Sequence, residues 1–149
     1  MIGDIDTCAE ETVRVITEAG GTALFLSTDV TVAEQLDNLG KQTVDSYGGL
    51  HVAFNNAGVL PPTDSLLEQT EADWDKITDV DLKGVFLSLK AEIAHMVTHH
   101  GGSIINTACI ADPGMSPYVA AKHGVMGLTK AAVLDYAAAG VRVNSLAHG

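Results

Sequence analysis

Apolar positions in the first half of the chain predict two amphipathic helices, each followed by a buried strand. A threonine with a glutamate three residues later forms a capping box, and such pairs at Thr7–Glu10 and Thr31–Glu34 mark the helix starts. Both helices end at a pair of glycines. The apolar runs TALFLSTDV and LHVAF then predict strands over 22–30 and 50–54.

The second half of the chain repeats this order with longer elements. A helix is predicted over 71–97, and because it is apolar on more than one face, one face should meet the sheet and the other a second helix or a subunit. The run SIINTA predicts a strand over 103–108. Ser116-Pro117 marks the start of a helix that runs to Gly140, and VRVNSL predicts a final strand.

Short apolar strands that alternate with helices are typical of an α/β protein, in which helices cover both faces of a parallel sheet. We therefore expect a single domain over residues 1–149 with a Rossmann-like, doubly wound sheet in three layers. Ligands bind such sheets at the carboxyl ends of the strands. Polar residues gather at these ends, with Asp29 after one strand, 55–58 after the next and 107–109 after the third.

Composition and charge narrow the classes of function. The chain has 149 residues and a formal net charge of -11, with only eight Lys and Arg residues, so we expect it to bind neither nucleic acid nor an anionic membrane. No signal peptide or membrane-spanning run is recognised. Cys8 and Cys109 lie far apart and fit neither a disulfide framework nor a zinc site, which favours a reducing cytoplasm. His99-His100 lacks a third metal ligand at matching spacing.

One pair of residues carries candidate chemistry. Tyr118 stands four residues before Lys122 in a predicted helix, so both side chains point to the same face. A nearby ammonium favours the phenolate and lowers the pKa of the phenol toward the range in which it serves as a general acid and base. The alternative is an aromatic residue at a helix start and a solvated lysine, which is common for so short a pattern.

Several motifs in order make the chain resemble the short-chain dehydrogenase/reductase family over essentially its whole length. They are Asp29-Val30 after a strand, Asn55-Asn56-Ala57-Gly58, DLKGVFLSLK, GGSIINTA, Tyr118-x-x-x-Lys122 followed by HGVMGLTKA, and VRVN. The resemblance implies an enzyme that transfers a hydride between NAD or NADP and a small alcohol or ketone. It also implies a homo-oligomer that is formed through the helices near 73–97 and 117–139.

The resemblance assigns roles to individual residues. Tyr118 would be the acid/base, and Lys122 would lower its pKa and bind the nicotinamide ribose. Asp29 and Val30 would hold the adenine, and Asn56, Ala57 and Gly58 would line the cofactor. Asp4 would accept hydrogen bonds from the adenosine ribose and repel a phosphate there, which favours NAD over NADP. Alternatively, Asn56 to Gly58 only shape a loop and Asp4 is part of a solvated turn.

Three departures from the family pattern lie in the predicted site. Cys109 stands where the family has a serine that binds the substrate oxygen, and a thiol is a weak donor. Asp81 stands where the family has the asparagine of its proton relay, and its charge would oppose the effect of Lys122 on Tyr118, unless Asp81 is only a partly exposed helix carboxylate. The interval from Cys109 to Tyr118 is also shorter than usual. A nucleophilic Cys109 paired with His123 is a further, less favoured interpretation.

The resemblance also predicts that the chain is truncated at both ends. It lacks the family's first strand with the glycine-rich loop that binds pyrophosphate, and it lacks the segment that selects the substrate. The strands on either side of the missing strand would then expose unpaired edges. Three hypotheses follow: an NAD-dependent oxidoreductase, a catalytically impaired relative that acts as a binding or subunit-interaction module, or a fragment whose other parts are encoded upstream.

Overall fold

A computed structural model describes residues 1–111 and 113–148, the last of these by its backbone only. The elements are, in chain order, β1 (Ile2–Asp4), α1 (Ala9–Glu18), β2 (Phe25–Ser27), α2 (Ala33–Tyr47), β3 (Val52–Asn55), α3 (Glu71–Thr78), the π-helix η1 (Asp79–Gly84), α4 (Val85–Met96), β4 (Gly102–Cys109), α5 (Ser116–Tyr136), the short 3-10 helix η2 (Ala137–Ala139) and β5 (Val141–His148). Strands and helices alternate, which confirms the α/β class.

The strands form two parallel sheets rather than one. β1 pairs with β2, and β3, β4 and β5 pair in that order. In the described residues, β1 and β3 each pair on one side only, so each has an open edge. The separation into two sheets is the one expected when β1 and β3 lack a central strand that pairs with both of them. The register places Asn55 of β3 opposite Asn106 of β4.

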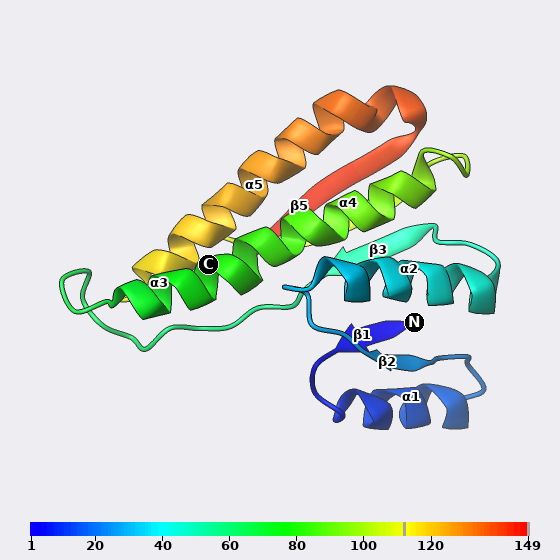
Figure 1. The fold of residues 1–149 in the computed structure, drawn as a ribbon, viewed down its shortest axis with the longest axis horizontal. Coiled ribbons are helices and arrows are strands. Elements are labelled where there is room, and N and C mark those ends of the chain that lie inside the picture. The colour runs from blue at the N-terminus through cyan, green and yellow to red at the C-terminus, as the bar shows by residue number, and fades with distance from the viewer. Residues whose placement is uncertain (112, 149) are drawn as a thin grey trace.

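The main hydrophobic core lies between the three-stranded sheet and two helices, α4 and α5 (Figure 1). Its buried members from α4 are Val85, Leu89, Ile93 and Met96, and they meet Ile104, Val125, Ala132, Val141 and Val143 from the sheet and α5. Burial of each large aliphatic side chain contributes about 1.5–3 kcal/mol. This core holds α5, which carries the tyrosine and lysine, firmly against β4.

The opposite face of the three-stranded sheet is open. The side chains of Val52 and Phe54 on β3 are 65% and 56% exposed, and Leu146 on β5 is 61% exposed. Three layers are complete only at β1 and β2, where α1 and α2 lie on opposite sides of the strands (Figure 1). Among the described residues, no helix packs against the residues of the three-stranded sheet that alternate away from α4 and α5.

The predicted helix starts are correct at one threonine and wrong at two. Thr70 and Asp73 form the reciprocal capping box of α3. Thr7 caps nothing, because the carboxylate of Asp6 accepts the Cys8 N–H in a preceding turn and α1 begins only at Ala9. Thr31 donates its hydroxyl to Asp29 Oδ1 instead of capping α2. Nearby carboxylates therefore override the threonine signal, because an ionised carboxylate is a stronger hydrogen-bond acceptor than a hydroxyl.

The long helix predicted over 71–97 is divided into three segments. A π-helical turn, η1, separates α3 from α4 and changes the direction in which the following side chains point. Gly84 ends this turn where a Cβ atom would lie only 2.8 Å from Val30 Cγ2, so glycine permits close contact with the loop after β2. The turn also places Asp81 inside the molecule.

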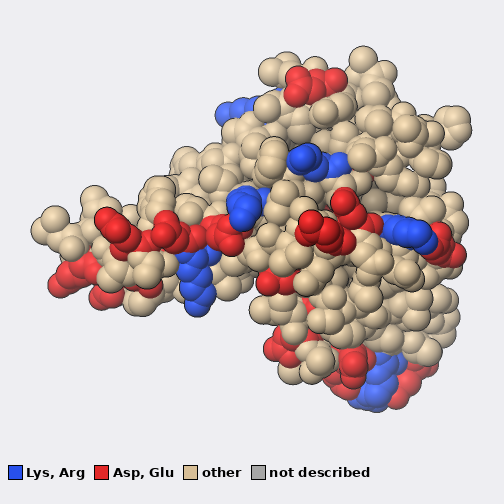
Figure 2. All heavy atoms as spheres, viewed as in Figure 1, with Lys and Arg blue, Asp and Glu red and all other residues tan. Residues whose placement is uncertain are grey.

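The surface agrees with the negative net charge. Acidic side chains gather along α3 and η1 at one end of the molecule (Figure 2). They include Asp73, Asp75 and Asp79, of which Asp79 forms an exposed ion pair with Lys83. Among the helices of the described residues, none is long and apolar enough to cross a membrane.

Candidate active site

A buried ion pair joins η1 to α5. Lys122 Nζ lies 3.1 Å from Asp81 Oδ1, and the two side chains are 2% and 0% exposed. The alternative that Asp81 is a partly exposed helix carboxylate is therefore wrong, since η1 packs against α5 and turns this side chain inward. A buried charge is tolerated only when it is paired and hydrogen-bonded. Each member of the pair consequently constrains where the other can lie.

The second oxygen of Asp81 binds the loop after β3. Val59 N donates to Asp81 Oδ2 at 2.9 Å. Burial raises the pKa of the Asp81 carboxyl, and this effect is opposed by the Val59 hydrogen bond and by Lys122. Gly58 lies so close that a Cβ atom on it would be 2.6 Å from Asp81 Oδ1. Glycine at this position thus permits the loop to approach the ion pair.

Tyr118 lies one turn before Lys122 on α5, and its side chain is 6% exposed. Lys122 Nζ stands 5.4 Å from the centroid of the Tyr118 ring. Tyr118 also packs in one buried cluster with Cys109, at the end of β4, and with Ile77 of α3. The fold therefore gathers Tyr118, Lys122, Asp81 and Cys109, although residue 112 of the short interval between Cys109 and Tyr118 lies outside the described residues.

The carboxyl ends of β3 and β4 meet at this site, as the sequence predicts for parallel strands. Thr107 Oγ1 donates to Asn56 Oδ1 at 2.8 Å, which ties the two loops together. Asn56, Ala57 and Gly58 are all exposed. An exposed, anchored loop beside a buried lysine is suited to contact a ligand. Contact of these three residues with a cofactor stays a prediction.

Asp4 and Asp29 follow neighbouring strands at the same edge. Asp4 is exposed, and its Oδ1 accepts the Asp6 N–H at 3.0 Å, so it takes part in a turn. Asp29 Oδ1 accepts from the backbone N–H and the hydroxyl of Thr31, and these bonds lower the pKa of the Asp29 carboxyl. Val30, beside it, packs against Gly84. Their roles toward an adenosine stay predictions.

The alternative sites suggested by histidines gain little support. The ring of His123 is exposed and its Nδ1 lies 2.9 Å from Val119 O, whereas Cys109 is buried. His99 stacks on His95 with ring centroids 4.0 Å apart. No set of three or more His, Cys, Asp or Glu residues in the described part of the chain is arranged to hold a metal ion.

A polar network that the sequence patterns did not predict lies behind the site. Glu92 of α4 and Thr129 of α5 bond to Asn55 and Asn106, the asparagines at the ends of β3 and β4. A signal was present, because Asn106 interrupts an apolar strand and Glu92 stands next to a core residue, Ile93. Polar residues at such positions need partners that only the fold can supply.

Comparison with known proteins gives a consistent result. A family model described as short chain dehydrogenase matches residues 2–149. A cyclohexanol dehydrogenase from Acinetobacter sp. (strain SE19) is 40% identical over 154 residues, covering 100% of this chain and 61% of that protein. A 3-oxoacyl-[acyl-carrier-protein] reductase from Synechocystis sp. is 38% identical over 147 residues, covering 96% of this chain and 59% of that protein.

Solved structures agree. A short chain dehydrogenase from Mycobacterium smegmatis superposes with a TM-score of 0.92 at 33% identity, over 98% of this chain and 63% of that one. An NAD+-bound xylitol dehydrogenase superposes with a TM-score of 0.93 at 29% identity, over 97% of this chain and 58% of that one. The chain thus spans about 60% of the length of the relatives that it matches.

Proposed function

The chain belongs to the short-chain dehydrogenase family, and from that premise we propose that it supports hydride transfer between NAD and a small alcohol or ketone. The observation that carries the proposal is the buried pair of Tyr118 and Lys122 on one face of α5, with Nζ 5.4 Å from the phenol ring. A buried cation beside a phenol is the arrangement that general acid–base catalysis by tyrosine requires.

The proposed mechanism assigns a separate task to each residue. When bound, NAD supplies the nicotinamide ring that accepts the hydride from the carbinol carbon. Tyr118 takes the hydroxyl proton of the alcohol as that carbon becomes a carbonyl, and returns a proton in the reverse reaction. Lys122 favours the phenolate form of Tyr118 and binds the nicotinamide ribose. Cys109, packed in the same cluster as Tyr118, faces the substrate oxygen as a weak donor.

The cofactor contacts follow the strand ends. Asn56, Ala57 and Gly58 are the proposed contacts near the nicotinamide half, on a loop that Asp81 and Thr107 anchor. Asp4 lies at the end of β1, where its carboxylate would bind the adenosine ribose hydroxyls and disfavour a 2′-phosphate, and Asp29 and Val30, which follow β2, would hold the adenine. This charge favours NAD over NADP, and titration with NADH and NADPH distinguishes the two.

The names of two relatives suggest a first substrate class. Two of them are a cyclohexanol dehydrogenase and a cis-4-hydroxycyclohexanecarboxylate dehydrogenase, both named for a secondary alcohol on a six-membered ring. We therefore propose cyclic secondary alcohols as the first substrates to screen.

A cytoplasmic location belongs to the same proposal. The two cysteines, one exposed and one buried, are compatible with a reducing cytoplasm.

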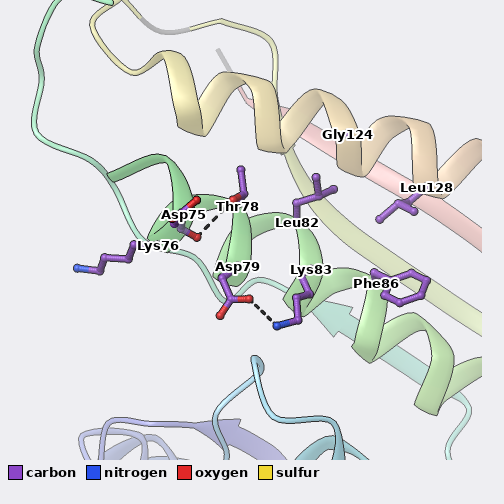
Figure 3. Close-up of a pocket in the computed structure, with 9 residues that line it drawn as sticks. All are labelled: Asp75, Lys76, Thr78, Asp79, Leu82, Lys83, Phe86, Gly124 and Leu128. Carbon is purple, nitrogen blue, oxygen red and sulfur yellow. Dashed lines mark hydrogen bonds and ion pairs between the residues drawn. The ribbon is translucent and has the colours of Figure 1, made fainter. Parts of the chain in front are cut away.

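A homodimer through the outer faces of α3, η1, α4 and α5 belongs to the same proposal. An open groove of about 860 Å³ runs between these helices (Figure 3). Leu82, Phe86 and Leu128 line it, and Phe86 is 44% exposed. Leu134, further along α5, is 85% exposed. A symmetric partner would remove these apolar side chains from water.

Thermal unfolding with NADH tests whether the site binds cofactor. NADH at about 100 times its dissociation constant should add roughly 2.7 kcal/mol to the free energy of unfolding, which raises Tm by several degrees. The variant Tyr118→Phe keeps the ring and removes the hydroxyl, so it should retain most of the NADH-induced shift in Tm. In a separate activity assay it should lose all oxidation of cyclohexanol. No shift in the unmodified chain, or turnover that persists in Tyr118→Phe, would refute the proposal.

A further inference from the structure

Glu92 is a partly buried carboxylate that the proposed mechanism does not use. It stands on α4 facing the end of β3, and its Oε2 accepts a hydrogen bond from Asn55 Nδ2 at 3.1 Å. Burial raises the pKa of Glu92 to about 7, against the opposing effect of the Asn55 bond. A carboxyl group is costly to bury, so its retention at this position calls for a partner or a task.

The hydrogen bonds of Asn106 and Thr129 determine the direction of the hydrogen bond between Asn55 and Glu92. Thr129 Oγ1 donates to Val125 O at 2.9 Å, and since a carbonyl oxygen only accepts, the direction of this bond is fixed. Thr129 then accepts from Asn106 Nδ2 at 3.0 Å, which turns Asn106 Oδ1 toward Asn55. Asn55 Nδ2 donates one hydrogen bond to Asn106 Oδ1 at 3.0 Å and a second one to Glu92 Oε2. Glu92 must therefore act as the acceptor.

This network ends at the base of the proposed cofactor loop. Asn55 is the last residue of β3 and directly precedes Asn56, Ala57 and Gly58. The network links Asn55 to α4, β4 and α5 together, so it fixes the direction in which the chain leaves the sheet. Further along, Val59 N binds Asp81. The loop is thus held at its far end by Asp81 and at its base by the bonds of Asn55.

We propose that Glu92 is a positioning residue that, by accepting from Asn55, holds the loop 56–58 in the geometry that binds the dinucleotide. The inference rests on the proposed function, because that loop is the proposed cofactor contact. Glu92 touches neither substrate nor cofactor in this role. It acts through Asn55 and supplies the one acceptor that completes the network.

Hydrogen exchange of the loop amides, measured without cofactor, tests the holding role. Glu92→Leu removes the acceptor and should speed exchange of residues 56–60 by about tenfold, the effect of losing one hydrogen bond. Glu92→Gln retains an acceptor oxygen and should stay within about twofold of the unmodified chain. Glu34→Leu, at an exposed position on α2, is the matched control and should change nothing. If Glu92→Leu fails to fold, Glu92→Asp shortens the side chain and provides the same test.

NADH affinity of the same variants tests the positioning role. Glu92→Leu should weaken binding by about tenfold and Glu92→Gln by less than about twofold. A looser loop with unchanged NADH affinity, or a loop that exchanges normally in Glu92→Leu and Glu92→Asp, would overturn the inference. If the unmodified chain binds no NADH, the proposed function fails, and the exchange data still decide whether Glu92 holds the loop.

Discussion

At the scale of single residues, the positive charge of Lys122 determines how strongly α5 favours the ionised form of Tyr118. A lone buried ammonium would act strongly on the neighbouring phenol, but Asp81 lies 3.1 Å from it and compensates part of its charge. A buried pair of this kind adds little net stability, although loss of either member leaves the other uncompensated. Asp81 therefore both secures Lys122 and weakens its influence on Tyr118.

Asp81→Asn should shift ionisation of the Tyr118 phenol to lower pH, because the lysine charge is no longer compensated. Ultraviolet difference titration near 295 nm follows tyrosinate formation, and the same titration of Tyr118→Phe identifies the signal among the three tyrosines. Circular dichroism establishes that the variant is folded. An unchanged titration would mean that Asp81 does not control the charge felt by Tyr118.

Glu92 should give stability an unusual dependence on pH. Its folded pKa of about 7 exceeds the ordinary 4.5, so the folded chain holds a proton that the unfolded chain has released, and stability falls as pH rises between these values. This rise in pKa corresponds to at most on the order of 3 kcal/mol. Glu92→Gln should remove the slope, and urea unfolding of both proteins from pH 5 to pH 8 measures it. Parallel curves for the two proteins would contradict the assignment.

At the scale of elements, two turns between helices and strands fix how β4 and β5 lie relative to each other. The turn between α4 and β4 passes close to the one that precedes β5. Gly101 has a φ of 86°, and a Cβ atom on it would lie 2.3 Å from Gly140 O. This contact fixes the starts of two adjacent strands, β4 and β5, relative to each other. A side chain has no room at this crossing.

Gly101→Ala should destabilise the fold by about 1–3 kcal/mol, because an alanine is strained at this positive φ and Gly140 must move. Gly40→Ala is the matched control, since a Cβ atom there meets no atom within 4 Å in the middle of α2. It should stabilise the chain by about 0.5–1 kcal/mol through its better helix propensity. Urea unfolding measures both, and equal effects would contradict this interpretation of the turn.

At the scale of the whole molecule, two apolar surfaces stand out. One is the groove along η1, α4 and α5, and the other is the open face of β3 with Val52 and Phe54. Acidic side chains gather along α3 and η1 beside the groove (Figure 2), and Lys76 and Lys83 line the groove with Asp75 and Asp79. Like charges across a symmetric interface repel, so a dimer through the groove should be strengthened by salt.

Phe86→Glu should disrupt the proposed dimer, because it places a carboxylate in the apolar groove that the partner would cover. Leu67→Glu is the matched control, at a 96% exposed position outside the helices. Sedimentation velocity at equal protein concentrations should show a smaller species for Phe86→Glu only. A monomer in every protein, or a dimer that survives in Phe86→Glu, would exclude this interface.

Much of the fold could be predicted from sequence because it depends on local patterns. The α/β order, the start of α3 after Thr70 and the meeting of the strand ends follow from the periodicity of apolar residues. The starts of α1 and α2 could not be predicted, because Asp6 accepts the Cys8 N–H and Asp29 accepts the Thr31 hydroxyl in the turns that precede these helices. The π-turn could not be predicted either, since it depends on contacts of Asp81 and Gly84 with other segments.

The sequence by itself determined which residues of the candidate site share a face. Tyr118 and Lys122 are one helical turn apart whatever surrounds them, because the helix repeat is a local property. Only the tertiary structure decided which side chains Lys122 and Asn55 contact. Asp81 is distant in sequence from Lys122, and Glu92 is distant in sequence from Asn55. Pairing of buried charges and polar groups depends on distance in space, and on the burial that makes an unpaired group costly.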